Sequence, residues 1–141
     1  MSSRHIIRRY ILETLYQLEF YPVSEHRAVY FRMERKIKDK NGKLFFRSLA
    51  EGVQNNLGQL NKMLDKYLKE DWSLERLSLV DRAILRLAIY ELCLQNDTSK
   101  TPPGVVINEA VELAKEYSAE ESAKFVNGVL GHIVRDTMPI E

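Results

Sequence analysis

Residues 123–132, AKFVNGVLGH, place an aromatic ring, an ammonium group, a side-chain amide and two glycines within one short stretch. At the helical spacing of 100° per residue, the apolar side holds Val126, Val129, Leu130 and Ile133, and the other side holds Lys124, Asn127, Gly128 and Gly131. Each glycine in a helix costs about 1 kcal/mol relative to alanine. A bare patch beside Phe125 and an ammonium group can stack a nucleobase and neutralise its phosphate.

Two other interpretations of this stretch remain open. Gly128 and Gly131 could let a second helix pack closely, with Phe125 buried at that contact. The Asn-Gly dipeptide between apolar pairs is also a hairpin signal. The helical stripe of apolar residues runs through the dipeptide, however, and disfavours the hairpin.

The N-terminal segment carries a second candidate surface. His5, Arg9, Leu12 and Tyr16 follow one another at helical spacing, with Arg4 and Arg8 on the flank of their stripe. Arginines supply the sequence-independent part of nucleic-acid binding, and an exposed Leu-Tyr pair suits a protein partner or a stacked ring. The alternative is a basic terminus that contacts only solvent.

The densest basic block lies in residues 27–47. It contains eight basic residues (Arg27, Arg32, Arg35, Lys36, Lys38, Lys40, Lys43 and Arg47) and two acidic ones (Glu34 and Asp39). Such a block forms either an RNA surface or a solvated face. Phe31, Phe45 and Phe46, which are interleaved with it, are expected in the core.

Catalytic and metal-binding patterns are weak. His5, His26 and His132 lie far apart without ligand spacing, and no glycine-rich phosphate loop occurs. Glu91 falls among apolar residues, where a structural pair is expected, and Cys93 is expected to be an inert, half-buried thiol. We therefore expect no enzyme, no metal and no cofactor.

Helical periodicity dominates the elements that must position these residues. Helices are expected over residues 4–20, 24–37, 43–69, 78–94, 105–117 and 119–135. Asn41-Gly42 predicts a turn before the long third segment. The segment 78–94 is apolar on nearly every side, with Arg82, Arg86 and Cys93 on a narrow strip, and is expected to be the central buried helix.

Local signals mark the ends of these helices. Ser73 can cap a short turn, and Ser78 with Asp81 and Ser118 with Glu121 resemble capping boxes. Residues 98–104, which include Pro102 and Pro103, predict a loop. The fold class is therefore all-α, a bundle of about six to seven helices.

Composition limits the remaining possibilities. The chain has 141 residues, which suits one domain, and its 21 Lys plus Arg against 20 Asp plus Glu leave a net charge of +1. Any nucleic-acid site must therefore be a local patch. One cysteine, no signal-peptide pattern and no long apolar run predict a cytoplasmic protein without a membrane span.

Four segments resemble the NusB family of transcription antitermination factors. They are residues 8–17 (RRYILETLYQ), 72–92 (WSLERLSLVDRAILRLAIYEL), 105–117 (VVINEAVELAKEY) and 124–130 (KFVNGVL), in the family's order and spacing. The resemblance implies two small helical subdomains, roughly 1–70 and 71–141, and no enzymatic activity.

The resemblance also implies a function and its residues. NusB-like proteins bind the boxA segment of nascent ribosomal RNA leaders together with NusE, a small-subunit ribosomal protein, and join the RNA polymerase antitermination complex. The implied RNA surface comprises Arg4, His5, Arg8, Arg9, Glu121, Lys124, Phe125 and Asn127. The implied partner surface comprises Tyr16, Tyr67, Asp81, Arg82 and Arg86. Gly131 departs from the family, which commonly has an acidic residue there.

Two further interpretations come from other functional classes. NusB-like domains occur fused to ribosomal RNA cytosine methyltransferases, but 141 residues leave no room for a cofactor-binding unit. A helical interaction module that self-associates through apolar edges is the other, and some relatives form homodimers. Light scattering across protein concentration separates that module from the RNA-binding adaptor.

Overall fold

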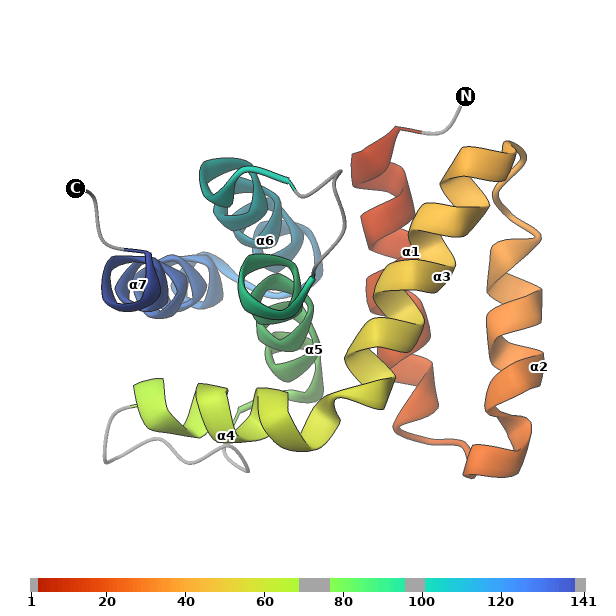
Figure 1. The fold of residues 1–141 in the computed structure, drawn as a ribbon, viewed down its shortest axis with the longest axis horizontal. Helices are drawn as coiled ribbons and strands as arrows, with labels where there is room; N and C mark the ends of the chain where they lie inside the picture. Colours follow the sequence, from red (N-terminus) through yellow and green to blue (C-terminus); the bar gives the residue numbers. More distant parts are fainter. Residues whose placement is uncertain (1–2, 69–76, 96–100, 139–141) are drawn as a thin grey trace. The chain divides into compact units, whose positions relative to one another are not determined.

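The computed structural model describes residues 3–68, 77–95 and 101–138. Within these ranges every regular element is helical, as the all-α prediction required (Figure 1). The chain divides into two compact units, Met1–Asn55 and Asn56–Glu141. The subdomain division expected from the sequence was about residue 70.

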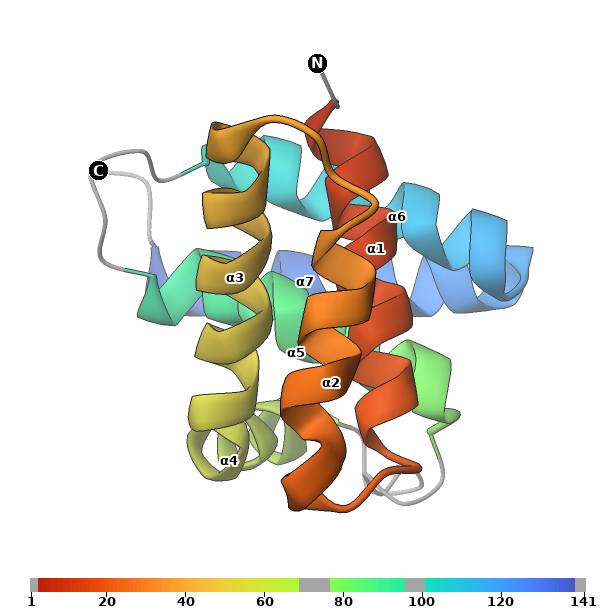
Figure 2. The same ribbon diagram turned by 90° about the vertical axis from the view of Figure 1, so that its right-hand side faces the viewer.

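The first unit is a three-helix assembly. It comprises α1 (Arg4–Leu18), α2 (Val23–Glu34) and α3 (Lys40–Asn55), and each of these helices packs against the other two (Figure 2). The predicted stripe on α1 is buried at Ile7, Ile11 and Leu15. Ser3 caps α1 by accepting a hydrogen bond from the Ile6 N–H at 3.2 Å.

Gly42 lies inside α3, so the turn predicted at Asn41-Gly42 is wrong. The Asp39 carboxylate accepts a hydrogen bond from the Gly42 N–H at 2.8 Å and satisfies a donor in the first turn of α3. A Cβ atom on Gly42 would lie 2.8 Å from Ile37 Cγ2 and 3.0 Å from Ile7 Cδ1. The glycine therefore permits close packing of α3 against its neighbours.

The helix expected over residues 43–69 is interrupted. α3 ends at Asn55, and α4 (Leu57–Tyr67) begins after Asn56, whose φ of −124° and ψ of 22° are not helical. Val53, Leu60 and Leu64 are all fully buried, so the apolar spacing continues across the break. Periodicity alone could not show the interruption.

The second unit is built around α5 (Leu79–Ile89). α5 contacts α4, α6 (Pro103–Tyr117), α7 (Glu120–Thr137) and the π-helical segment Tyr90–Leu94 that follows it. Every residue from Ala83 to Ile89 is buried, which confirms the prediction of a central buried helix. α6 and α7 pack against each other, and α4 also contacts α7.

Of the two predicted capping boxes, one cap forms. The Ser78 hydroxyl accepts a hydrogen bond from the Asp81 N–H at 3.0 Å and caps α5. At α7 the N-cap is Ala119, and the Ser118 hydroxyl instead bonds the Ser122 hydroxyl at 2.8 Å. The cap predicted at Ser73 and the start of the loop predicted at 98–104 lie outside the described residues.

Candidate nucleic-acid interface

One face of α7 is exposed around Gly128, as its sequence predicts. Lys124, Asn127 and Gly128 are exposed, and Gly131 is partly exposed. Val126, Leu130 and Ile133 on the opposite side are fully buried. The hairpin interpretation of Asn127-Gly128 is wrong, because both residues lie inside the helix.

The space around the two glycines decides between the remaining interpretations. Apart from Gly128, its two chain neighbours and the nearby backbone of its own helix, no described atom lies within 4 Å of the position that a Cβ on Gly128 would take. A Cβ on Gly131 would lie 3.3 Å from Arg135 Nη1, a side chain of the same helix. Close packing of another helix therefore does not explain either glycine in the described part of the chain.

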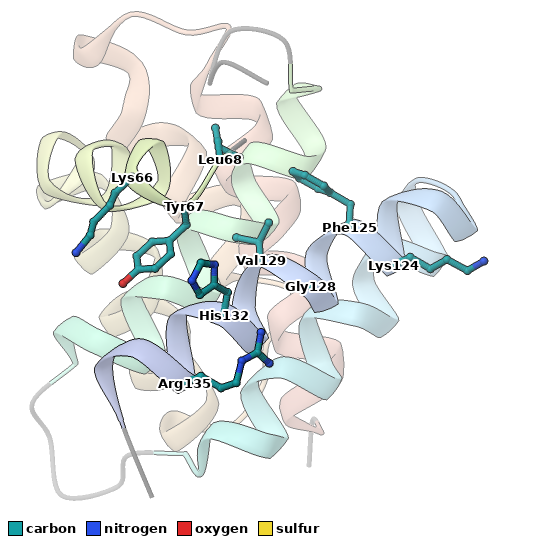
Figure 3. Close-up of a pocket in the computed structure, with 9 residues that line it drawn as sticks. All are labelled: Lys66, Tyr67, Leu68, Lys124, Phe125, Gly128, Val129, His132 and Arg135. Atoms are coloured by element: carbon teal, nitrogen blue, oxygen red, sulfur yellow. The ribbon is translucent and has the colours of Figure 1, made fainter. Parts of the chain in front are cut away.

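Gly128 instead borders a pocket between the end of α4 and α7. The pocket has a volume of about 490 Å³ and is lined by Lys66, Tyr67, Leu68, Lys124, Phe125, Gly128, Val129, His132 and Arg135 (Figure 3). All nine residues belong to the second unit. Three carry aromatic rings and three carry permanent positive charges, whereas none is acidic.

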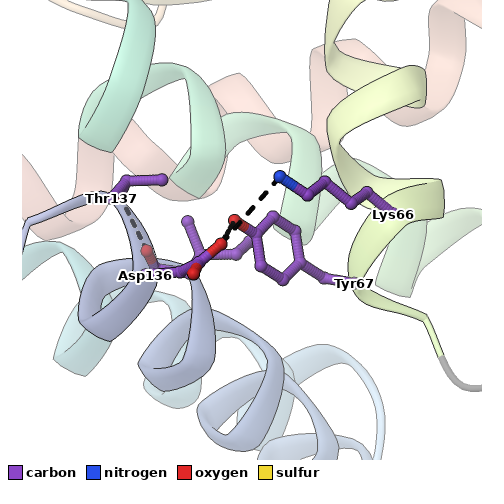
Figure 4. Close-up of polar contacts among 5 residues, drawn as sticks. Lys66, Tyr67, Asp136 and Thr137 are labelled. Carbon is purple, nitrogen blue, oxygen red and sulfur yellow. Dashed lines mark hydrogen bonds and ion pairs between the residues drawn. The ribbon is translucent and has the colours of Figure 1, made fainter.

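Tyr67 is held in place on the α4 side of the pocket. Its hydroxyl donates a hydrogen bond to the Asp136 carboxylate, and its ring packs edge-on against His132, with 5.1 Å between ring centroids (Figure 4). The Asp136 hydrogen bond is the main cause that raises the pKa of Tyr67 to about 12. The same bond lowers the pKa of Asp136.

The three cationic side chains around the pocket differ in orientation and in their contacts with acidic groups. Lys66 Nζ lies 4.0 Å from Asp136 Oδ2. Lys124 extends away from Tyr67 and His132, whereas the Arg135 side chain turns back along α7 (Figure 3). The close approach of Arg135 Nη1 to Gly131 places this guanidinium against bare helix backbone.

The N-terminal arginines in the first unit are organised by Phe45. The Arg4 guanidinium carbon lies 3.9 Å from the centroid of the Phe45 ring, and that of Arg8 lies 5.1 Å from it. Arg4 and Arg9 are exposed, but Arg8 is only 3% exposed. As placed, Arg8 supports the surface from beneath and does not present its charge to solvent.

We compared this chain with protein families and with known proteins. The model of the NusB family matches residues 5–135. The chain belongs to the NusB family. It is 40% identical over 133 residues to the transcription antitermination protein NusB of Acetivibrio thermocellus, with 94% of this chain and 89% of the relative covered.

Solved NusB structures share the fold. Thermotoga maritima NusB has a TM-score of 0.80 at 38% identity, with 98% of this chain and 94% of that chain covered. A structure of the antitermination factors NusB and NusE in complex with dsRNA has a TM-score of 0.77 at 29% identity, with 94% and 96% covered.

The NusB-like partner residues predicted from the sequence do not share one environment. Tyr16 is 39% exposed and packs edge-on against Phe20, which is 61% exposed. Asp81 accepts a hydrogen bond from Ser122 at 3.1 Å. Arg86 is 8% exposed and donates to Asn61 Oδ1 at 2.9 Å, so it is part of the interior. Tyr67 joins Phe125 in the α4–α7 pocket.

The remaining predicted residues lie at the surface or close to it. His5 and Arg82 are partly exposed, and the Arg82 guanidinium donates to the Leu77 carbonyl at 3.3 Å. Glu121 is exposed in the first turn of α7.

Part of the basic block at residues 27–47 is engaged within the first unit. Arg47 pairs with Glu51 and lies over the Tyr30 ring, and Arg32 donates to Gln17 at 2.9 Å. Phe46 is fully buried as predicted, but Phe31 is 62% exposed, so its core placement is wrong.

Sequence reasoning missed several residues of this NusB-like site. Lys66, Leu68, His132 and Arg135 line the pocket, and Phe45 holds the N-terminal arginines. His132 lies four residues after Gly128, so helical spacing could have placed it on the same face. The contribution of α4 depends on tertiary packing and leaves no such signal.

Metal-binding and membrane features are absent from the described residues. No group of three or more His, Cys, Asp or Glu side chains is positioned to hold a metal ion in these ranges. Among the same residues, no helix combines the length and the hydropathy that crossing a bilayer requires.

Proposed function

We propose that this NusB-family chain is a non-catalytic RNA-binding adaptor in transcription antitermination. It binds boxA-type single-stranded RNA of nascent ribosomal RNA leaders together with NusE, and with it joins the RNA polymerase antitermination complex in the cytoplasm. The family match over residues 5–135 and the solved relative with NusE and dsRNA support the RNA and the partner.

The observation that carries the proposal is the exposed backbone at Gly128. A helix interior tolerates this glycine at a cost of about 1 kcal/mol, and no packing contact within 4 Å among the described residues explains it. The neighbouring Phe125 and the pocket cations supply stacking and charge, the two contacts that single-stranded RNA requires.

The N-terminal end of α1 supplies the second part of the proposed RNA surface. Arg4 is exposed and rests on Phe45, which limits the side-chain freedom that phosphate binding would otherwise remove. We assign phosphate contacts to Arg4 and Arg9 in preference to the buried Arg8. His5, Glu121 and Asn127 complete the proposed contacts.

The proposed NusE surface centres on the exposed pair Tyr16 and Phe20. Aromatic residues are enriched at the cores of protein interfaces, and these two rings already pack against each other. In the second unit, Asp81 and Arg82 supply further polar contacts with NusE, whereas the buried Arg86 contributes through the fold.

The test is a fluorescence titration of a labelled boxA-like RNA and a scrambled RNA, with and without NusE, at several salt concentrations. Preference for boxA that tightens with NusE supports the proposal. The double charge reversal Arg4→Glu and Lys124→Glu should remove binding, because both side chains are exposed and each variant places a negative charge where the proposal places a phosphate.

The matched control reverses Lys62 and Lys115, two exposed lysines outside the pocket. It applies the same change in net charge at sites without a proposed RNA contact. Equal loss of binding in both double variants would show that only overall charge matters and would refute the proposed surface.

A further inference from the structure

Three polar side chains link the starts of two helices in the second unit. Ser122, the third residue of α7, donates a hydrogen bond from its hydroxyl to Oδ2 of Asp81, the third residue of α5, at 3.1 Å. The Ser118 hydroxyl lies 2.8 Å from that of Ser122. A hydroxyl has one proton to donate, so Ser118 is the donor to Ser122. This serine–aspartate link therefore runs from Ser118 through Ser122 to the Asp81 carboxylate.

The link acts at a helix end that has no side-chain cap. The N-cap of α7 is Ala119, and no side chain there accepts a hydrogen bond from the first turn. Glu120 and Glu121, the first two residues of the helix, are exposed. Helix ends without a cap fray more readily. The hydrogen bond from Ser122 to Asp81 therefore ties an uncapped turn to the central helix of the unit.

Both ends of the link lie beside residues with proposed binding roles. Lys124 and Phe125 follow Ser122 by two and three positions in α7, so a change in the first turn of α7 moves these two RNA contacts. At the other end, Asp81 is itself a proposed NusE contact. The link thus connects a proposed partner contact with proposed RNA contacts.

One oxygen of the Asp81 carboxylate has no donor. Oδ1 is buried and has no hydrogen-bond partner within the described residues, whereas Oδ2 accepts from Ser122. A buried acceptor without a donor carries the cost of its lost hydration. The Asp81 residue as a whole is partly exposed, so its carboxylate can turn outward and let water satisfy both oxygens. The carboxylate that has turned outward no longer holds Ser122.

We propose that Ser122 is a positioning residue through which NusE binding at Asp81 tightens RNA binding at the start of α7. In the chain without NusE, the carboxylate exchanges between the orientation bonded to Ser122 and the orientation turned to water. A partner that covers the start of α5 removes water from the second orientation and so favours the first. The first turn of α7 is then fixed before RNA arrives, and RNA binding loses less conformational entropy. This inference rests on the proposed function.

The quantity to measure is the coupling factor, the ratio of the RNA affinities with and without saturating NusE. We expect a factor of at least about five in the unaltered chain, the low end of coupling between two binding sites. By thermodynamic reciprocity, RNA must tighten NusE binding by the same factor. Fluorescence titrations with the labelled boxA-like RNA, and separately with labelled NusE, measure the two values.

Ser122→Ala removes the hydroxyl from the link. This variant of the full chain should bind RNA alone within about twofold of the unaltered chain, but its coupling factor should fall below about two. Ser122→Thr keeps a hydroxyl and should restore the factor. In Asp81→Ala, which lacks the acceptor, the further change Ser122→Ala should leave the coupling factor as it is.

The matched control is Ser48→Ala. Ser48 is an exposed serine inside α3, so the same hydroxyl is removed from a helix without touching the link. This variant should keep the full coupling factor. Circular dichroism confirms that every variant is folded.

Hydrogen exchange gives a readout at the helix itself. NusE alone, without RNA, should slow the exchange of the backbone amides of residues 123–126 in the unaltered chain but not in Ser122→Ala. Equal slowing in both proteins would mean that NusE covers the start of α7 directly, and the inference would be refuted.

The outcomes separate this inference from the proposed function. If the unaltered chain shows coupling and Ser122→Ala keeps it, NusE and RNA influence each other by another route, such as direct contact. The inference then fails and the RNA-binding function stands. The same conclusion follows if Ser48→Ala loses coupling as well, or if NusE leaves the RNA affinity of the unaltered chain unchanged. If the unaltered chain with NusE binds no RNA, both proposals fail.

Discussion

Phe45 shows how one uncharged side chain can control a cationic surface. Its ring lies 3.9 Å from the Arg4 guanidinium carbon, and a cation–π contact of this kind contributes about 0.5–1 kcal/mol at an exposed site. We expect Phe45→Leu to weaken RNA binding about twofold to fivefold. The measurement is the same titration, with unfolding followed separately.

Phe31→Leu is the control for that substitution. Phe31 is 62% exposed, and the Arg35 guanidinium carbon lies 6.0 Å from its ring centroid, so the chemical change is the same at a looser contact. An equal loss of affinity in both variants would show that Phe45 does not act through Arg4.

Tyr67 and Asp136 predict a pH dependence of stability. The pKa of Tyr67 is raised from 10.0 to about 12, so its stabilisation is complete below pH 10.0 and is lost as the pH rises toward 12. The pKa of Asp136 is lowered from 3.8, so its stabilisation is complete above pH 3.8 and is lost as the pH falls through the folded-state pKa.

Tyr67→Phe should therefore be less stable than the unaltered chain by a constant amount from about pH 5 to about pH 9. The difference in the free energy of unfolding between the two proteins should shrink in acid and in strong base. Urea unfolding at a series of pH values measures it. Tyr16→Phe, at an exposed ring, is the control, and a similar acid dependence there would contradict the assignment to Asp136.

At the scale of single residues, the sequence predicts which side chains are exposed better than it predicts which side chains contact one another. Lys124 and Asn127 are exposed where helical spacing puts them. The contacts of Arg4 with Phe45 and of Tyr67 with Asp136 join residues 41 and 69 positions apart, and no local pattern reports such pairs.

At the scale of the helix, the same substitution should have opposite effects at two glycines. Gly42→Ala should lower the free energy of unfolding by about 1–3 kcal/mol, because its Cβ would lie 2.8 Å from Ile37 Cγ2. Gly128→Ala should raise it by about 1 kcal/mol, because the space there is open. Thermal or urea unfolding measures both, and destabilisation by Gly128→Ala would refute the open environment.

The capping serines provide a second test at this scale. Ser78→Ala should destabilise the protein by about 1 kcal/mol, since it removes the N-cap of α5. Ser118→Ala should have a smaller effect, because the N-cap of α7 is Ala119. Equal losses in urea unfolding would show that the two serines are equivalent.

Helix identity follows from apolar periodicity, whereas helix boundaries do not. The buried α5 and the apolar faces of α1 and α7 agree with the predicted stripes. The break at Asn56 was missed because Val53, Leu60 and Leu64 keep their helical spacing across it. The start of α3 was misplaced because Asn-Gly is a turn signal, but here the Asp39 carboxylate satisfies the first turn.

For the whole molecule, a net charge of +1 predicts a shallow salt dependence of RNA binding. If Arg4, Arg9 and Lys124 each neutralise one phosphate, the slope of log affinity against log salt should be about −2. Titrations at four or more salt concentrations measure it. A slope near −5 would require the basic block at residues 27–47 to dominate.

The internal contacts of that block favour the shallow slope. Arg47 is paired with Glu51, and Arg32 donates to Gln17, so part of its charge is already used within the first unit. Replacing exposed Lys38 and Lys40 with glutamine should change RNA affinity less than Lys124→Gln does. The opposite ranking would move the RNA site to the block.

The open space at Gly128 also sets a conflict between two kinds of selection. A laboratory screen for heat tolerance would enrich alanine at this position, because the helix gains and no neighbour is displaced. A screen for RNA capture would discard the same variants, because a methyl group would cover the exposed backbone at Gly128 on which the proposed RNA contact depends. Engineered versions of this protein should therefore be stabilised elsewhere, and Gly58 is the helical glycine at which to begin.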